Sequence, residues 1–199
     1  MIESIEENRR TLFALNESLR AEADRMLEES GLGEIIREEG FEPSGSYDWH
    51  VMTWHELDFE RCDNNPTLQE HWELGERFFR NDWVWGMRYI DASRDPRNPG
   101  DEGYFWRLDV INPHGGELWL IDLWTAKPEV FERSAPKRPL WRRIINDDSR
   151  YYILLIKEVV GKLPEYKKSV FSWDIYEAVL EHEVRSVDEF WEWWRGRDR

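Results

Sequence analysis

The sequence has one cysteine, Cys62, and no apolar run close to the ~20 residues that a membrane-spanning helix needs. A single cysteine cannot form a disulfide within the chain, which favours a reducing compartment. The N-terminal segment MIESIEENRRT contains no apolar signal region. These absences predict a cytoplasmic protein with no membrane partner, and they argue against a secreted domain held together by disulfides.

Lysine is absent from the first 126 residues, and all six lysines lie between Lys127 and Lys168. The whole chain has 27 basic and 42 acidic residues, which gives a formal net charge of −15. A field of this sign repels a polyanion, so we expect no nucleic-acid partner. The basic stretch either holds a small anionic ligand or only solvates helix surfaces.

Several catalytic motifs are also missing. The sequence contains no G-x-S-x-G motif and no Walker A lysine loop, which argues against a hydrolase elbow and a P-loop enzyme. Its five histidines show no H-x-x-x-H or Cys/His spacing, so no zinc site is predicted. At 40% hydrophobic and 15% aromatic residues, the composition is that of a folded chain.

Apolar residues at three- and four-residue steps predict helices, whereas alternation of apolar and polar residues predicts strands. Helices are predicted over 2–30, 33–40, 66–80, 139–162 and 172–195. Strands are predicted over His55–Cys62, Trp83–Ile90, Tyr104–Ile111 and Glu117–Thr125, with a turn over 42–50 and loops over 91–103 and 112–116.

This order of elements indicates an α+β fold, in which a mixed sheet flanked by helices precedes a C-terminal helical lobe. We expect residues 1–127 to form the α/β core with its N-terminal helix, and residues 128–199 to form the helical lobe. Trp85, Trp106 and Trp119 lie on predicted strands, where we expect them to pack in the core.

The stretch from Gly45 to Asp58 carries the pattern that indicates chemistry. Gly45-Ser46 is followed, after nine residues, by Glu56-Leu57-Asp58. The two-residue period of a strand places Glu56 and Asp58 on one face, where paired carboxylates repel unless a cation such as Mg²⁺ lies between them. A third carboxylate is expected on a neighbouring strand, where Asp122 in WLIDLW and Asp109 in WRLDVI are the two candidates.

This pattern resembles the nucleotidyltransferase superfamily, the fold of polymerase β and of the aminoglycoside nucleotidyltransferases. Within it, SGSYDWHVMTWHELDFE is similar to a bacterial group of nucleotidyltransferase-domain proteins. The resemblance implies that Gly45 and Ser46 contact nucleotide phosphates and that Glu56 and Asp58 bind the metal. Asp122 would be the third metal ligand and would activate the acceptor hydroxyl, with Asp109 as the alternative.

The activity implied by this resemblance is Mg²⁺-dependent transfer of a nucleoside monophosphate from an NTP to a small-molecule hydroxyl. AMP, from ATP, is the expected group. The β- and γ-phosphates need positive partners, and the strands contain no lysine. Lys157, in the apolar stretch ILLIKEVV, is the first choice for this role in the helical lobe, which would bind substrate. The alternative is a lysine that lies along the surface with its charge in water.

Two departures from the family pattern support a second hypothesis. The first carboxylate is Glu56 instead of the commoner aspartate, and Asp48 places negative charge near the expected phosphate site. A catalytically inactive member that binds nucleotide or a protein partner would accommodate both. Transfer of AMP to a protein is neither favoured nor excluded, and the sequence predicts no oligomeric state.

Overall fold

The computed structural model describes residues 2–95 and 103–197 of the 199-residue chain. The helices are α1 (Ile2–Glu29), α2 (Leu32–Glu38), α3 (Gly45–Asp48), α4 (Leu68–Phe79), α5 (Pro128–Ser134), α6 (Arg138–Ile144), α7 (Asp147–Val160), α8 (Ser172–Glu181) and α9 (Val187–Gly196), with a 3₁₀ turn at Ala92–Arg94. The strands are β1 (Glu42–Ser44), β2 (Glu56–Cys62), β3 (Val84–Asp91), β4 (Gly103–Val110) and β5 (Trp119–Ala126).

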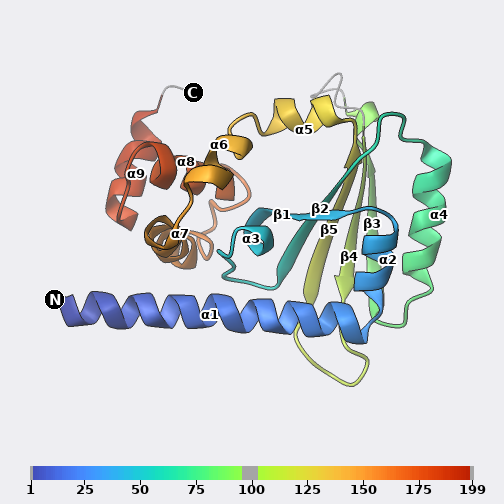
Figure 1. Cartoon of the computed structure of the whole chain (residues 1–199), viewed down its shortest axis with the longest axis horizontal. Helices are drawn as coiled ribbons and strands as arrows, with labels where there is room; N and C mark the ends of the chain where they lie inside the picture. The colour runs from blue at the N-terminus through green and yellow to red at the C-terminus, as the bar shows by residue number, and fades with distance from the viewer. Residues whose placement is uncertain (1, 96–102, 198–199) are drawn as a thin grey trace. The chain divides into compact units, whose positions relative to one another are not determined.

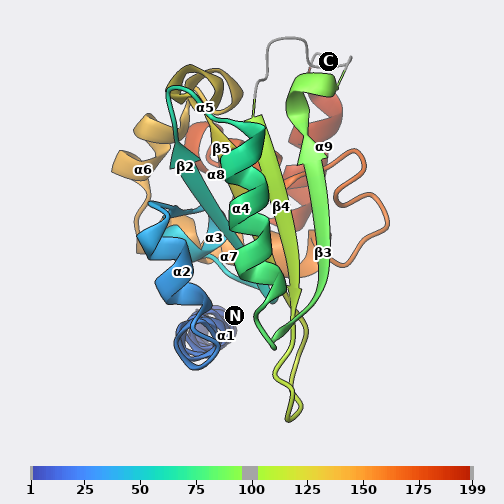
Figure 2. The same cartoon turned by 90° about the vertical axis from the view of Figure 1, so that its right-hand side faces the viewer.

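The five strands form one mixed sheet in the order β1-β2-β5-β4-β3. Strands β2 and β5 are parallel, and the other neighbouring pairs are antiparallel. The chain between β2 and β5 passes through α4 and the β3–β4 pair, and α4 lies across one face of the sheet (Figure 2). The predicted α+β class, with a mixed sheet flanked by helices, is therefore confirmed.

The apolar face of the sheet contains the side chains that alternate with the charged ones. Leu57, Leu108 and Ile121 lie at matching positions on β2, β4 and β5, and none of them is exposed. Helix α4 covers this face with Leu74 and Phe78, which are also fully or almost fully buried. Burial of these side chains fixes which face of each strand points away from the helix.

The chain divides into two compact units that differ from the expected division at residue 127. The unit called here the sheet unit consists of residues 19–48 and 54–136, and the helical unit consists of residues 1–18, 49–53 and 137–199. Helix α1 thus contributes to both. In the helical unit, α7, α8 and α9 pack against one another around buried Ile153, Ile156 and Phe190 (Figure 1).

The two long C-terminal helices that the sequence predicts are each divided in two. The predicted helix over 139–162 is interrupted where Asn146 and Ser149 form a capping box that begins α7. The predicted helix over 172–195 is interrupted between α8 and α9, where Glu183 has φ 53° and the Ser186 side chain accepts from the Glu189 backbone N–H. At both N-caps a side chain accepts a hydrogen bond from a backbone N–H group of the first turn, and this bond favours the start of a separate helix.

Three further differences are local. The predicted turn over 42–50 contains the short strand β1 and the single-turn helix α3. Helix α5 was not predicted, and residues 96–102 of the predicted loop lie outside the described residues. Trp106 and Trp119 are buried as expected, but Trp85 is 69% exposed because the register shifts between Val84 and Gly86 and interrupts the alternation there.

No helix in the described ranges combines the length and the apolar character that crossing a bilayer requires.

Candidate functional site

Glu56, Asp58 and Asp122 lie together on the face of the sheet opposite α4. Strands β2 and β5 pair in parallel with Asp58 directly opposite Asp122, and Glu56 precedes Asp58 by one strand period. Glu56 and Asp122 are buried, at 7% and 8% exposure, and Asp58 is half-buried. The three acids that the sequence predicts as metal ligands are thus neighbours on two adjacent strands.

Arg107 on β4 is a further member of this site, and the sequence analysis did not identify it. The β4–β5 register places Arg107 opposite Asp122. Its Nε and Nη2 each donate to one carboxylate oxygen of Asp122 at 2.6 Å, and Nη2 also donates to Glu56 Oε1 at 3.2 Å. The hydrogen bonds to Asp122, together with the charges of Asp122, Glu56 and Asp58, raise the pKa of Arg107. The guanidinium is therefore a permanent cation held among these acids.

The second oxygen of Glu56 has its own donor. Trp54 lies two residues before Glu56, and its indole Nε1–H donates to Glu56 Oε2 at 2.9 Å. Both oxygens of Glu56 and both oxygens of Asp122 therefore accept hydrogen bonds from the protein itself. These bonds offset part of the cost of burying the two carboxylates, and they fix the direction in which each one points.

Gly45, the first residue of the Gly-Ser pair, lies against Asp58. Gly45 has φ +60°, and a Cβ atom added to it would lie 2.4 Å from Asp58 Oδ2. Both facts exclude a side chain at this position, since the backbone conformation is strained for L-residues and the space is already filled by the Asp58 carboxylate. Ser46 follows at the start of α3 and is buried. The backbone thus approaches one of the predicted metal ligands closely.

Asp109, the alternative third acid, lies on β4 two residues after Arg107. It pairs with Leu120 on β5 and with Gly86 on β3. A Cβ atom added to Gly86 would lie 2.7 Å from Asp109 Oδ2, which places this carboxylate over β3. Asp122, by contrast, shares the guanidinium of Arg107 with Glu56. The geometry therefore favours Asp122 as the third member of the group.

Lys157, the predicted phosphate contact, belongs to the helical unit. It is 1% exposed, so the alternative of a surface lysine with its charge in water is wrong. Its Nζ donates to the carbonyl oxygen of Val51 at 2.8 Å and lies 5.7 Å from the ring centroid of Tyr176. A role for Lys157 in nucleotide binding stays a prediction.

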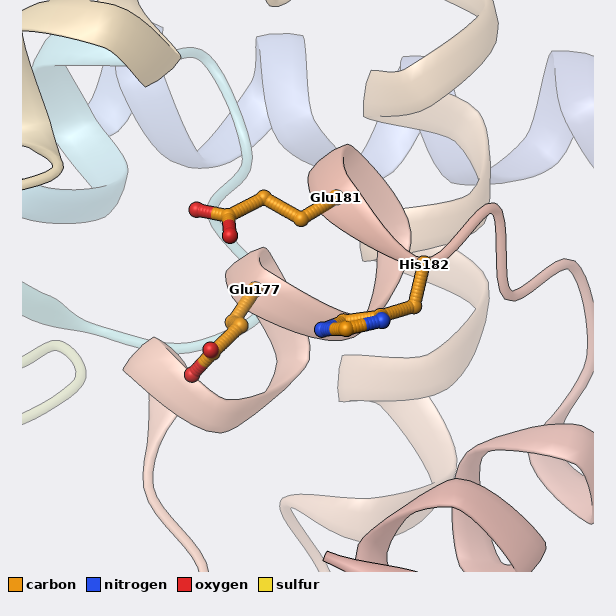
Figure 3. Close-up of side chains that lie close together, drawn as sticks. All are labelled: Glu177, Glu181 and His182. Carbon is orange, nitrogen blue, oxygen red and sulfur yellow. The ribbon is translucent and has the colours of Figure 1, made fainter.

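A second group of potential metal ligands lies in the helical unit. Glu177 and Glu181 are one turn apart on α8, and His182 follows at its C-terminal end (Figure 3). One ligand atom from each lies within 4.8 Å of the others. Glu177 and His182 line a cavity of about 950 Å³. The Glu-x₃-Glu-His spacing is the sequence signal for this group, and it differs from the His/His and Cys/His spacings that are typical of zinc sites.

Protein donors already surround the two glutamates of this second group. Lys137 Nζ donates to Glu177 at 2.6 Å and to Glu181 at 2.9 Å, and Trp141 Nε1–H donates to Glu181 at 2.5 Å. The hydrogen bonds to Glu177 and Glu181 raise the pKa of Lys137. This arrangement is a lysine-centred ion-pair cluster on the surface of the helical unit, and nothing else in the described residues points to a ligand there.

Comparison with known proteins leaves the sheet site without an assigned family. No model of a known protein family matches this chain, and no curated protein matches it either. The resemblance of the Gly45–Asp58 segment to nucleotidyltransferases therefore stays a prediction from the sequence.

Proposed function

We propose that this protein is a Mg²⁺-dependent nucleotidyltransferase, which transfers AMP from ATP to a hydroxyl group of a small molecule. The observation that supports the proposal is the arrangement of three acids beside a glycine. Asp58 and Asp122 are in direct register on parallel strands, Glu56 lies on the same face, and Gly45 packs against Asp58. The Gly45–Asp58 segment is thus joined by a third acid, Asp122, which lies 64 residues after Asp58 in the sequence.

Glu56, Asp58 and Asp122 offer the right kind of ligand for a divalent cation, but they are not among the groups of described residues whose ligand atoms all lie within 4.8 Å of one another, so they would have to draw closer to hold one. Carboxylate oxygens are the ligands that Mg²⁺ prefers, and Mg²⁺ usually takes one or two of them together with phosphate oxygens and water. Because Gly45 has no side chain, its backbone lies directly against the Asp58 carboxylate. Glu56, Asp58 and Asp122 would hold the ion, which when bound would neutralise charge on the phosphoryl oxygens.

The protein groups have distinct roles in the proposed reaction. The acceptor oxygen forms a bond to the α-phosphorus, the bond from that phosphorus to the bridging oxygen breaks, and pyrophosphate leaves. Asp122 accepts the proton of the acceptor hydroxyl. Gly45 and Ser46 position the phosphates through their backbone and the serine hydroxyl, which is the role that the family resemblance implies. The strands contain no lysine, and Arg107 supplies positive charge beside the acids.

A second candidate function follows from the contacts of Arg107. Its guanidinium is bonded to both oxygens of Asp122 and to Glu56, so these acids already have a cation. A protein that only binds nucleotide would retain such an ion pair without loss of function, since it has no catalysis to impair. This alternative predicts nucleotide binding with no release of pyrophosphate.

The first experiment measures the melting temperature with ATP and Mg²⁺, added separately and together. We expect the two together to raise the melting temperature of the native chain, because a ligand that binds only the folded state stabilises it. Asp58→Asn should abolish this shift. Glu60→Gln is the matched control, since it removes one charge from the same strand and face two residues further on, and it should keep the shift.

Pyrophosphate release then separates the two candidates. ATP and Mg²⁺ are supplied with pools of hydroxyl compounds, among them cationic aminosugars, because the chain has a net charge of −15. Release that depends on an acceptor and is lost in Asp58→Asn supports the transferase. ATP binding without release across all pools supports the binding protein. If ATP and Mg²⁺ leave the melting temperature of the native chain unchanged, both proposals are contradicted.

A further inference from the structure

Strand β3 forms an open edge of the sheet. It is the last strand in the order β1-β2-β5-β4-β3, and no other segment of the described ranges pairs with its outer side (Figure 2). From Met87 to Asp91 its register with β4 is regular, and this stretch contains no proline and no lysine. An edge of this kind presents backbone N–H and C=O groups with which a further extended segment can pair.

An apolar groove of about 340 Å³ lies beside this edge, between β3 and α4. Its lining comes from three elements: Trp72, Gly75, Glu76 and Phe79 of α4, Met87 of β3 and Trp106 of β4. Trp72 and Phe79 are seven residues apart, which places them on one side of the helix two turns from each other. The volume is at the lower end of the range of ligand pockets, about 300–1,000 Å³, and suits single side chains.

The groove is formed by contacts within the sheet unit. A Cβ atom added to Gly75 would lie 2.4 Å from Trp106 Cζ2, so α4 lies directly against this indole ring. Trp106 is 5% exposed, and its Nε1–H donates to the carbonyl oxygen of His71 at 3.0 Å. Trp72 packs edge-on against the same ring, with ring centroids 5.4 Å apart. The groove therefore exists before anything binds, which limits the ordering that binding requires.

Exposed aromatic side chains and acids surround the groove. Phe79 is 77% exposed and Trp72 is 49% exposed, and neighbouring exposed apolar side chains of this size are typical of an interaction site. Glu76 pairs with Arg80, whereas Glu73 accepts a hydrogen bond from Gln69 and forms no ion pair within the part of the chain that the structure describes. With a net charge of −15, the chain repels a second copy of itself and attracts a basic partner.

We propose that the groove between α4 and β3 binds an extended segment of a basic partner protein, which adds to the sheet as a further strand at the edge of β3. Pairing of main-chain groups with an edge strand gives such a complex its affinity, and pockets for alternate side chains give its specificity. Because strand side chains alternate with a period of two, every second residue of the segment faces the groove and is apolar. Lysine or arginine residues beside this apolar pattern interact with Glu73.

The first experiment measures binding of three synthetic nine-residue peptides by fluorescence anisotropy. All three have alternating valine and serine at the centre, and their two residues at each end are lysine, serine or glutamate. We expect the lysine peptide to bind about tenfold more tightly than the glutamate peptide at low salt, and the difference to shrink at high salt because salt screens charge. N-methylation of one alternate set of backbone amides should abolish binding, and N-methylation of the other set should not, since only alternate residues pair with the edge strand.

Substitutions locate the binding surface. Phe79→Ala removes an exposed groove side chain and should weaken binding of the lysine peptide about tenfold. Leu118→Ala is the matched control, because Leu118 is an exposed apolar residue of the same unit, and it should leave binding within twofold of native. Glu73→Gln should reduce the preference for lysine over glutamate ends, whereas Glu117→Gln, at another exposed position, should keep it.

The remaining outcomes overturn the inference. Binding that survives N-methylation of either set shows that no strand is added, and binding that Phe79→Ala leaves unchanged places the peptide elsewhere. Equal affinity for lysine and glutamate ends contradicts a basic partner, and dissociation constants above about 1 mM for all three peptides contradict a peptide site. A native dimer that Phe79→Ala separates into monomers in size-exclusion chromatography would make a second copy the occupant. These measurements contain no ATP and no Mg²⁺, so their failure is distinct from failure of the proposed function.

Discussion

Both faces of the sheet have buried side chains at their centre, but different interactions hold them. On the face under α4, Leu57 and Leu108 are fully buried among other apolar side chains. On the opposite face, Glu56 and Asp122 are less than a tenth exposed and bind Arg107. Burial of an apolar side chain stabilises a fold, whereas a buried ion pair roughly balances its desolvation cost. The apolar face therefore contributes more to the stability of the sheet than the charged face does.

The largest effect on stability is expected on the apolar face. Leu108→Ala removes a fully buried side chain from β4 and should lower the free energy of unfolding by about 2–5 kcal/mol, measured by urea denaturation. Asp109→Asn, at the next residue on the opposite face, is the matched control and should cost less than about 1 kcal/mol. An equal loss of unfolding free energy in the two variants would contradict the conclusion that the apolar face contributes more stability than the charged face.

A histidine of α4 is buried against the apolar face of the sheet. His71 on α4 is 1% exposed and stacks against Tyr104 and Trp106, with ring centroids 5.0 Å and 5.2 Å away. Burial lowers the pKa of His71 to about 4, against a smaller opposite effect of the Phe105 backbone. The histidine is therefore neutral in the folded protein over most of the acidic range, while its unfolded form takes up a proton near pH 6.5.

This difference predicts how stability depends on pH. Between pH 6.5 and 4 the unfolded chain binds more protons at His71 than the folded chain, so stability falls as the pH falls through this window. The loss should reach about 3 kcal/mol at most. His71→Phe keeps an aromatic ring and removes the titration, so the native chain should lose more stability than the variant between pH 7.5 and 4.5 in urea denaturation. Parallel curves would show that His71 is not the group responsible.

Local patterns made much of the charged face predictable from the sequence. Glu56 and Asp58 share a face because strand side chains alternate with a period of two, and that period needs no tertiary information. The choice between Asp109 and Asp122 was open because it depends on which atoms each carboxylate contacts across β4 and β5. Arg107 was missed for the same reason, since its bond to Asp122 follows from the antiparallel register and not from the sequence around it.

Prediction of the fold was limited in the same way, because local patterns do not reveal how strands pair. Four strands were predicted within about two residues of their ends, because their apolar and aromatic runs are bounded by turns. The breaks at Asn146 and Ser186 were missed although both carry an N-cap signal, because the apolar spacing continues across them. The exposed side chain of Trp85 depends on a register shift that no local pattern marks. Features decided by strand pairing therefore required the structure.

The smallest effect on stability is expected when the charges of the site are removed together. Asp122→Asn alone leaves Arg107 without its closest charged partner and should cost about 1.5–3 kcal/mol, the value of a hydrogen bond to a charged group. The triple variant Glu56→Gln, Arg107→Met and Asp122→Asn keeps side chains of similar size and removes every charge of the ion pair. It should lie within about 1 kcal/mol of the native chain in urea denaturation, because the desolvation cost disappears together with the attraction. A triple variant that is less stable than Asp122→Asn would mean that the ion pair makes a net contribution to the stability of the sheet. The ion pair would then have a structural role, and its presence would not indicate a ligand site.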